Sequence, residues 1–86
     1  MKDYELFVQQ IIEDKAQELQ MLSDFIWDHP ETLYEEYDSS AEICNYLEQQ
    51  GFDIEQGIAN IPTAFSATFG NKGLVIGLLA EYDALP

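Results

Sequence analysis

The sequence is poor in basic residues: lysine and arginine total 3, against 17 aspartate and glutamate residues, so the formal net charge of the 86-residue chain is −14. Proteins that bind nucleic acid neutralise phosphates with lysine and arginine, and proteins that dock on anionic membranes use the same side chains. Both classes of function are therefore disfavoured. The acidic surface is instead predicted to keep the protein dispersed through charge repulsion.

Cysteine, histidine and long apolar runs are also scarce. Cys44 is the single cysteine, so an internal disulfide is excluded, and His29 is the single histidine. The first residues do not combine a basic segment with an apolar one, as a secretory signal would. The longest apolar run is much shorter than the ~20 residues that a membrane-spanning helix needs. The sequence therefore predicts a cytoplasmic protein.

What the chain does contain is apolar side chains in regular patterns. They make up 47% of the residues, which excludes general disorder. Residues 3 to about 28 repeat apolar side chains at steps of three and four, which predicts an amphipathic helix that ends before Pro30 and packs its apolar stripe on a core. The stripe consists of Tyr4, Phe7, Val8, Ile11, Ile12, Ala16, Leu19, Leu22, Phe25 and Ile26.

A second helix is predicted to begin near Ser39. Ser39 has the character of an N-cap, and Glu42 follows three residues later, which is the spacing of a capping box. Gly51 follows Gln50 at the place where a helix often ends with a glycine of positive φ. The connection before this helix, residues 29–38, is expected to be irregular.

After Gly51 the pattern changes to that of strands. Residues 52–57 alternate apolar and acidic side chains, residues 63–69 form a second probable strand, and residues 74–80 form an uninterrupted apolar run. The sequence Gly-Asn-Lys-Gly at 70–73 predicts a turn that pairs the second strand with the third as a hairpin.

The expected fold class is therefore α/β, with two N-terminal helices followed by three strands. The third strand has no polar face, so it requires cover on both sides of the sheet. Two helices can cover only one side of a small sheet. On these grounds residues 1–86 are expected to be the opening part of a larger α/β domain.

Two carboxylates follow the third strand. Side chains alternate along an extended chain, so Glu81 and Asp83 are expected to lie on one side. Open α/β sheets place ligands just beyond such strand ends. The pair could bind a hard metal ion or orient a ligand of one. A catalytic zinc needs about three protein ligands, however, so the alternative is that the pair only makes the strand end polar.

Other residues with reactive side chains have plainer interpretations. His29, beside a predicted helix end, is expected to cap the helix or bond within the loop rather than bind metal. Glu31, Glu35 and Glu36 could form a metal cluster, but without neighbouring ligands they are expected to be solvated. Cys44 lies on the apolar face of the second helix and is expected to be a buried thiol rather than a nucleophile.

Six segments are informative when taken in order: Trp-Asp-His-Pro-Glu at 27–31, Tyr-Glu-Glu at 34–36, Ser-Ser at 39–40, Leu-Glu-Gln-Gln-Gly-Phe-Asp-Ile at 47–54, Ile-Pro-Thr-Ala-Phe at 61–65 and Ala-Glu-Tyr-Asp-Ala-Leu-Pro at 80–86. Together they resemble a family of metal-dependent amidohydrolases and peptidases that includes hippurate hydrolase, aminoacylase and aminobenzoyl-glutamate hydrolase. The resemblance runs from about residue 20 to the end of the chain.

The resemblance implies a zinc-exopeptidase-like catalytic domain with a central mixed sheet, interrupted by a smaller dimerisation domain, in an enzyme that forms homodimers. Residues 1–86 would be an incomplete N-terminal part of that catalytic domain. The resemblance also implies one or two divalent metals, zinc or manganese, and hydrolysis of an amide bond in an N-acyl or aminobenzoyl amino acid or a small peptide. Asp83 matches an aspartate that supports the metal centre in relatives. Glu81 stands where the peptidase relatives carry a metal-binding histidine.

The ligands that the family takes from later Cys-Gly-His, glutamate and histidine segments have no match here, and neither Cys44 nor His29 corresponds to them. The chain alone is therefore predicted to bind no zinc tightly and to hydrolyse no amide, so no metal ligand is assigned within it. The alternative function is that of a free-standing acidic binding module, acyl-carrier-like or protein-interacting. The strand patterns of the second half disfavour a carrier protein, which would be helical throughout.

Overall fold

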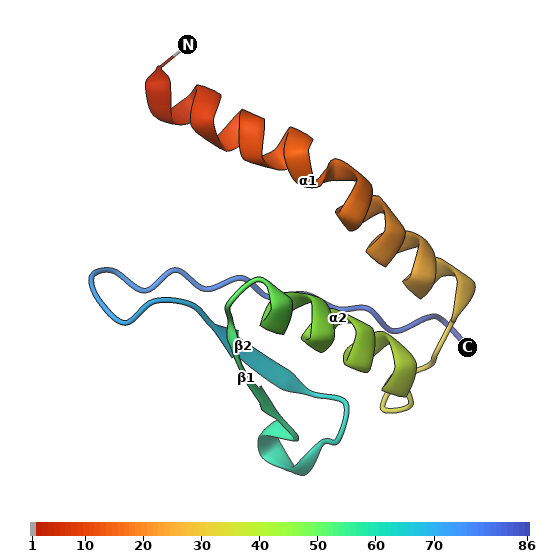
Figure 1. The fold of residues 1–86 in the computed structure, drawn as a ribbon. Helices are drawn as coiled ribbons and strands as arrows, with labels where there is room; N and C mark the ends of the chain where they lie inside the picture. Colours follow the sequence, from red (N-terminus) through yellow and green to blue (C-terminus); the bar gives the residue numbers. More distant parts are fainter. Residues whose placement is uncertain (1) are drawn as a thin grey trace.

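The computed structural model describes residues 2–86 and consists of two helices followed by a small antiparallel sheet (Figure 1). Helix α1 spans Asp3–Asp28 and helix α2 spans Tyr37–Gln49. Strand β1, Asp53–Gln56, is followed by a short 3₁₀ helix, η1, at Ile58–Asn60, and by strand β2, Phe65–Thr68. The predicted order of two helices and then strands is confirmed for these elements.

Helix α1 is amphipathic as predicted, but its apolar stripe does not face a core. None of its residues is buried, and Tyr4 and Phe7 are 63% and 66% exposed. Its N-terminal half projects away from the remainder of the chain in Figure 1. Within the stripe, only Leu22, Phe25 and Ile26 near the C-terminal end are partly covered. The predicted helix is confirmed, but the prediction that its apolar stripe packs on a core is wrong for residues 2–86, which provide little surface to cover it.

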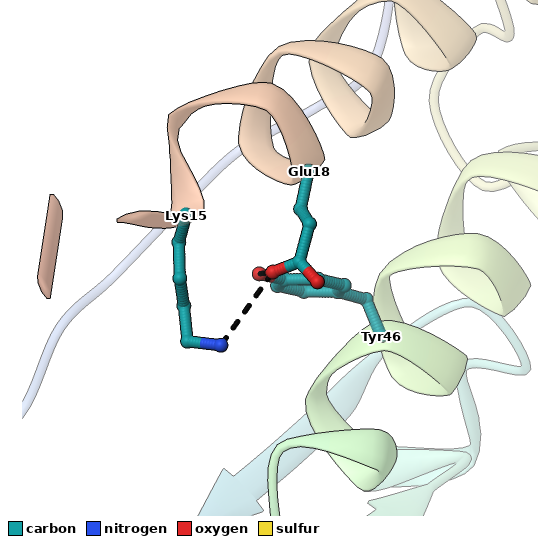
Figure 2. A network of polar contacts seen from close by, with 3 residues as sticks. All are labelled: Lys15, Glu18 and Tyr46. Carbon is teal, nitrogen blue, oxygen red and sulfur yellow. Dashed lines mark hydrogen bonds and ion pairs between the residues drawn. The ribbon is translucent and has the colours of Figure 1, made fainter. Parts of the chain in front are cut away.

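A polar contact connects the middle of α1 to α2. The Tyr46 hydroxyl donates a hydrogen bond to Glu18 Oε2 at 3.2 Å, and Lys15 Nζ lies 3.5 Å from the same oxygen (Figure 2). All three side chains are exposed to solvent to a considerable degree, so the ion pair contributes at most about 1 kcal/mol to stability. The contact orients α1 over α2 without forming a core between them.

The C-terminal end of α2 follows the sequence prediction closely. Gly51 has φ of 97°, its amide donates to Glu48 O at 3.0 Å, and the Phe52 amide donates to Leu47 O at 3.0 Å. This pair of hydrogen bonds is the Schellman motif, which requires a left-handed residue that only glycine adopts without strain. The chain then reverses, so β1 runs back beneath the helix.

A small core lies between α2 and the sheet. Helix α2 contacts both strands, and Cys44, on its inner face, is 3% exposed. Phe52 and Phe69 pack with their ring centroids 5.3 Å apart. Cys44 is a free thiol in this core, as predicted, and its burial keeps it away from solvent reagents.

The sheet has two strands rather than the predicted three. Strands β1 and β2 pair antiparallel, with Asp53 opposite Thr68 and Gln56 opposite Phe65. Gly70 and Gly73 have the positive φ of the predicted turn, but residues 74–80 form no strand and do not pair with β2. Leu74, Val75, Ile76, Leu78 and Leu79 are 85–96% exposed. The run lacks cover because α2 lies on the sheet of β1 and β2, and the apolar stripe of α1 is itself exposed instead of packing on this run.

None of the helices described in residues 2–86 has the length and apolar character needed to cross a membrane.

Candidate functional site

The first turn of α2 is capped by a residue from the preceding loop. Glu31 accepts hydrogen bonds from the backbone amides of Asp38, at 2.9 Å to Oε2, and Ser39, at 2.7 Å to Oε1. These amides lie at the second and third positions of the helix and have no partner within it. A carboxylate there also opposes the positive end of the helix dipole. Glu31 therefore performs the function of an N-cap from a distance in sequence.

This arrangement corrects the predicted capping box at Ser39. The helix begins at Tyr37, Glu36 occupies the N-cap position, and neither Glu36 nor Ser39 caps through its side chain. Ser39 lies instead inside the first turn, is 1% exposed and donates its amide to Glu31. The local pattern placed the N-cap three residues after its position at Glu36, and it could not reveal a capping group supplied by the loop.

The environment of Glu31 favours its charged form. Partial burial of the carboxyl group acts to raise its pKa, but the hydrogen bonds from Asp38 and Ser39 outweigh burial, so the pKa is lowered from its ordinary value of 4.5. A carboxyl group with a lowered folded-state pKa stabilises the fold above its unfolded pKa, and this stabilisation is lost as pH falls through the folded-state pKa.

We expect the Glu31→Gln substitution to lower the free energy of unfolding by about 1 kcal/mol at neutral pH, which is the usual loss for a helix cap. The difference from the unmodified chain should shrink as pH falls from about 4.5 through the lower folded-state pKa of Glu31, because the unfolded and then the folded chain take up a proton at this residue. Urea unfolding followed by circular dichroism at neutral and acidic pH measures both effects. Glu35→Gln, in the same loop and exposed, is the charge-matched control. An equal loss in both variants would contradict the capping role.

A buried polar cluster joins the start of α2 to the segment before β2. Thr63 Oγ1 donates to Glu36 Oε1 at 3.2 Å, and Ser40 Oγ donates to the Thr63 carbonyl at 3.1 Å. Glu36, Ser40 and Thr63 are 8%, 6% and 3% exposed. Buried polar groups of this kind are stable only when their hydrogen bonds are made. The cluster therefore fixes the position of Thr63 relative to the helix. Glu36, predicted to be solvated, is buried instead.

The acidic strand end docks on this cluster. The Tyr82 hydroxyl donates to the Thr63 carbonyl, and its ring lies 6.2 Å from that of Phe65. Glu81 and Asp83 are exposed, whereas Tyr82 and Ala84 are partly buried. The two carboxylates thus face solvent on the side opposite the docked tyrosine, which matches the alternation predicted for this segment.

Burial raises the pKa of the Tyr82 phenol above its ordinary value of 10.0, and the negative charge of Glu36 acts in the same direction, whereas the nearby Ser40 hydroxyl group acts to lower it. The phenol therefore remains protonated throughout the neutral range and can act as a hydrogen-bond donor there. Its contribution to stability is complete below pH 10 and is lost as pH rises above that value, because the unfolded chain ionises first.

His29 behaves as a loop residue, as predicted. Its ring stacks on Phe25 at a centroid distance of 4.0 Å and an interplanar angle of 16°, and its Nδ1 lies 2.7 Å from the Phe25 carbonyl oxygen. Among residues 2–86, no three histidine, cysteine, aspartate or glutamate side chains are close enough to hold a metal ion. The residues present therefore do not fit a complete metal site.

The structure gives structural roles to three residues for which the sequence reasoning had none: Glu36 and Thr63 of the buried cluster, and Tyr82. A signal for Tyr82 was available, since a tyrosine between two acids in an extended segment must point away from both. No local pattern marked the role of Thr63, which depends on a helix that lies far from it in sequence.

Comparison with known proteins finds relatives that include a hydrolase subunit, a dipeptidase and a carboxypeptidase. The chain is 44% identical over 85 residues to one of the subunits of the p-aminobenzoyl-glutamate hydrolase of Escherichia coli K12, covering 99% of this chain and 18% of that protein. It is 33% identical to the Xaa-Arg dipeptidase of Mus musculus, over 87% of this chain and 20% of that enzyme. Thermostable carboxypeptidase 2 of Saccharolobus solfataricus is 38% identical over 71% of this chain and 16% of its own length.

The chain thus spans about a fifth or less of the length of these relatives. No family model matches the sequence. No solved structure matches it significantly.

Proposed function

Because the chain is related over nearly its whole length to a segment of the peptidase and amidohydrolase family, we propose that it forms the N-terminal part of the catalytic domain of such a hydrolase. The observation that carries the proposal is the 44% identity to the p-aminobenzoyl-glutamate hydrolase protein of Escherichia coli over 99% of the chain. The docked segment 81–84, with two exposed carboxylates, is the feature of the fold that fits a catalytic role.

The proposed substrate is a small amide, either an N-acyl or aminobenzoyl amino acid or a short peptide. Support comes from the names of three relatives, which are a p-aminobenzoyl-glutamate hydrolase, an Xaa-Arg dipeptidase and a carboxypeptidase. All three names describe cleavage of an amide bond in a substrate that contains an amino acid. The chain itself carries none of the cationic surface that would attract a polyanionic substrate.

We propose that the enzyme depends on zinc or manganese, and that Asp83 supports the metal centre rather than completing it. Residues 2–86 offer no group of three ligating side chains, so the ligands would come from outside these 86 residues. Asp83 is exposed beside Glu81, at the end of the apolar run, where a carboxylate can accept a hydrogen bond from a ligating side chain. Its role would be to orient that ligand.

Two uncovered apolar surfaces support membership of a larger domain. The stripe of α1 and the segment 74–79 are both exposed, although each has the apolar pattern of a packed element. Contiguous apolar surface of this extent generally marks an interface. Further strands and helices of a catalytic domain would cover both. The free thiol of Cys44 fits a reducing compartment such as the cytoplasm, and a homodimeric enzyme is proposed from the family resemblance.

The alternative of an acyl-carrier-like module is not favoured. Such a module would be helical throughout, whereas the chain forms an antiparallel sheet beneath α2. Ser39 and Ser40, at the start of α2, are 1% and 6% exposed, so neither hydroxyl is accessible for attachment of a prosthetic arm.

The proposal is tested by replacing the matching segment of the Escherichia coli p-aminobenzoyl-glutamate hydrolase protein with this chain. We expect the chimera to hydrolyse p-aminobenzoyl-glutamate when it is combined with the remaining part of that hydrolase. The substitution Asp83→Asn in the chimera should lower kcat by about 10- to 100-fold, as is usual for groups that orient metal ligands. Asp53→Asn, in an exposed position of β1, is the control and should have little effect.

The isolated 86-residue chain supplies the second arm of the same experiment. It should neither hydrolyse the substrate nor bind zinc or manganese stoichiometrically, because it lacks three clustered ligands. Turnover by the isolated chain would contradict the proposal that the metal ligands come from outside these 86 residues. A folded chimera without activity would overturn the proposed function.

A further inference from the structure

We propose that Tyr82 is a positioning residue, which holds the strand-end segment 81–84 against the start of α2 so that Asp83 is presented outward in a fixed direction. This inference rests on the proposed function for the importance of Asp83. The attachment itself is a property of the fold and does not depend on any catalytic role.

The first attachment is made by the Tyr82 side chain. Its hydroxyl donates to the carbonyl oxygen of Thr63, and Ser40 Oγ donates to the same oxygen at 3.1 Å. A carbonyl oxygen has two lone pairs, so the two hydroxyl groups complete its hydrogen bonding. The Tyr82 ring also packs on Phe65, with 39° between the ring planes. The Tyr82 side chain is thus connected to α2, through the Thr63 carbonyl that it shares with Ser40, and it also contacts Phe65, the first residue of β2.

The second attachment is made by the backbone two residues later. The Ala84 amide donates to the Glu31 carbonyl at 2.7 Å. Glu31 is also the residue whose carboxylate caps α2, so its position is already fixed by Asp38 and Ser39. Residues 82 and 84 are therefore both tied to groups at the start of α2, the first through its side chain and the second through its backbone.

A side-chain attachment at Tyr82 and a backbone attachment at Ala84 together determine the direction of Glu81 and Asp83. Side chains alternate in an extended chain, so fixing 82 and 84 prevents the segment from rotating about its axis. Glu81 and Asp83 are then held on the opposite, exposed side. Correct orientation of a catalytic group to within about 0.5 Å generally depends on such supporting contacts. The phenol remains a donor at neutral pH, which keeps this support in place.

The first arm of the test uses the 86-residue chain and the substitution Tyr82→Phe, which keeps the ring and removes the hydroxyl donor. We expect hydrogen exchange of the Ala84 amide, measured by NMR, to become faster by about fivefold to tenfold, the usual effect of losing one hydrogen bond. Exchange in the middle of α2 should not change, which shows that the fold is intact. Tyr34→Phe, at a tyrosine that is 58% exposed, is the matched control. Unchanged exchange at Ala84 would overturn the inference.

The second arm places Tyr82→Phe in the active chimera. We expect kcat to fall by about tenfold with KM nearly unchanged, because Asp83 would be misoriented while substrate contacts remain. A normal kcat together with faster exchange at Ala84 would show that the attachment does not serve catalysis, and would also overturn the inference. If the chimera without this substitution is inactive, the proposed function fails, and the exchange experiment still decides whether Tyr82 anchors the segment.

Discussion

Replacement of Ile76 and Leu78 by lysine is expected to make the chain monomeric, because we expect the unsubstituted chain to self-associate despite its acidic charge. These side chains are 85% and 96% exposed, and they belong to the uncovered apolar segment 74–79. The segment follows β2, whose edge opposite β1 is also unpaired in the sheet. An exposed apolar segment beside a free strand edge is a typical site of association between copies of a chain. The association should strengthen with salt, because the chain carries a net charge of −14 that repels other copies.

The expected effect of the double substitution is large. Burial of one leucine or isoleucine side chain contributes about 1.5–3 kcal/mol, so loss of two from an interface weakens association by about a hundredfold or more. Sedimentation velocity over a range of protein concentrations measures the change. The control replaces Trp27 and Leu85, which are 83% and 93% exposed, by lysine and alters the net charge equally. A chain that is monomeric before substitution, or a control that dissociates equally well, would contradict the assignment to this segment.

The second large effect is expected from Thr63→Val, which removes one donor from the buried cluster at the start of α2. Valine has nearly the shape of threonine but leaves the Glu36 carboxylate, 8% exposed, without the hydrogen bond at 3.2 Å. Loss of a partner for a buried charged group costs about 2–3 kcal/mol. A domain of this size is stabilised by only about 4–13 kcal/mol in total, so the loss is a substantial fraction.

Urea unfolding followed by circular dichroism measures the loss, and two further variants identify its cause. Thr63→Ser keeps the hydroxyl group and should lose only about 1 kcal/mol for the missing methyl group. The double variant Thr63→Val with Glu36→Met removes both polar partners, so much of the lost stability should return. If Thr63→Val and Thr63→Ser are equally destabilised, the hydrogen bond to Glu36 is not the cause.

The elements that the sequence predicted well are those determined by neighbouring residues. The helix of residues 3–28, the end of the second helix at Gly51 and the alternation from Glu81 to Asp83 all appear as expected. Each depends on side-chain spacing or on one backbone requirement that is visible within a few positions. Burial of Cys44 was also predictable, because it lies on the apolar face of its own helix.

The features that could not be predicted depend on contacts between distant residues. Glu31 caps a helix that begins six residues after it, and Thr63 is fixed by Glu36 and Ser40, more than twenty residues away. The segment 74–80 has the composition of a buried strand, but composition does not provide the neighbours that burial requires. The absence of that cover explains why β2 pairs with β1 alone.

Glu31 bonds to two parts of the chain, so the local unfolding of one part is coupled to that of the other. Its carboxylate holds the first turn of α2, and its carbonyl holds Ala84, one residue beyond Asp83. Local unfolding usually involves contiguous cooperative units rather than single hydrogen bonds. Fraying of the first turn of α2 would therefore release the segment that carries Asp83 in the same event. The first turn of α2 and the orientation of the Asp83 side chain, about forty-five positions apart in the sequence, would therefore be lost and regained together.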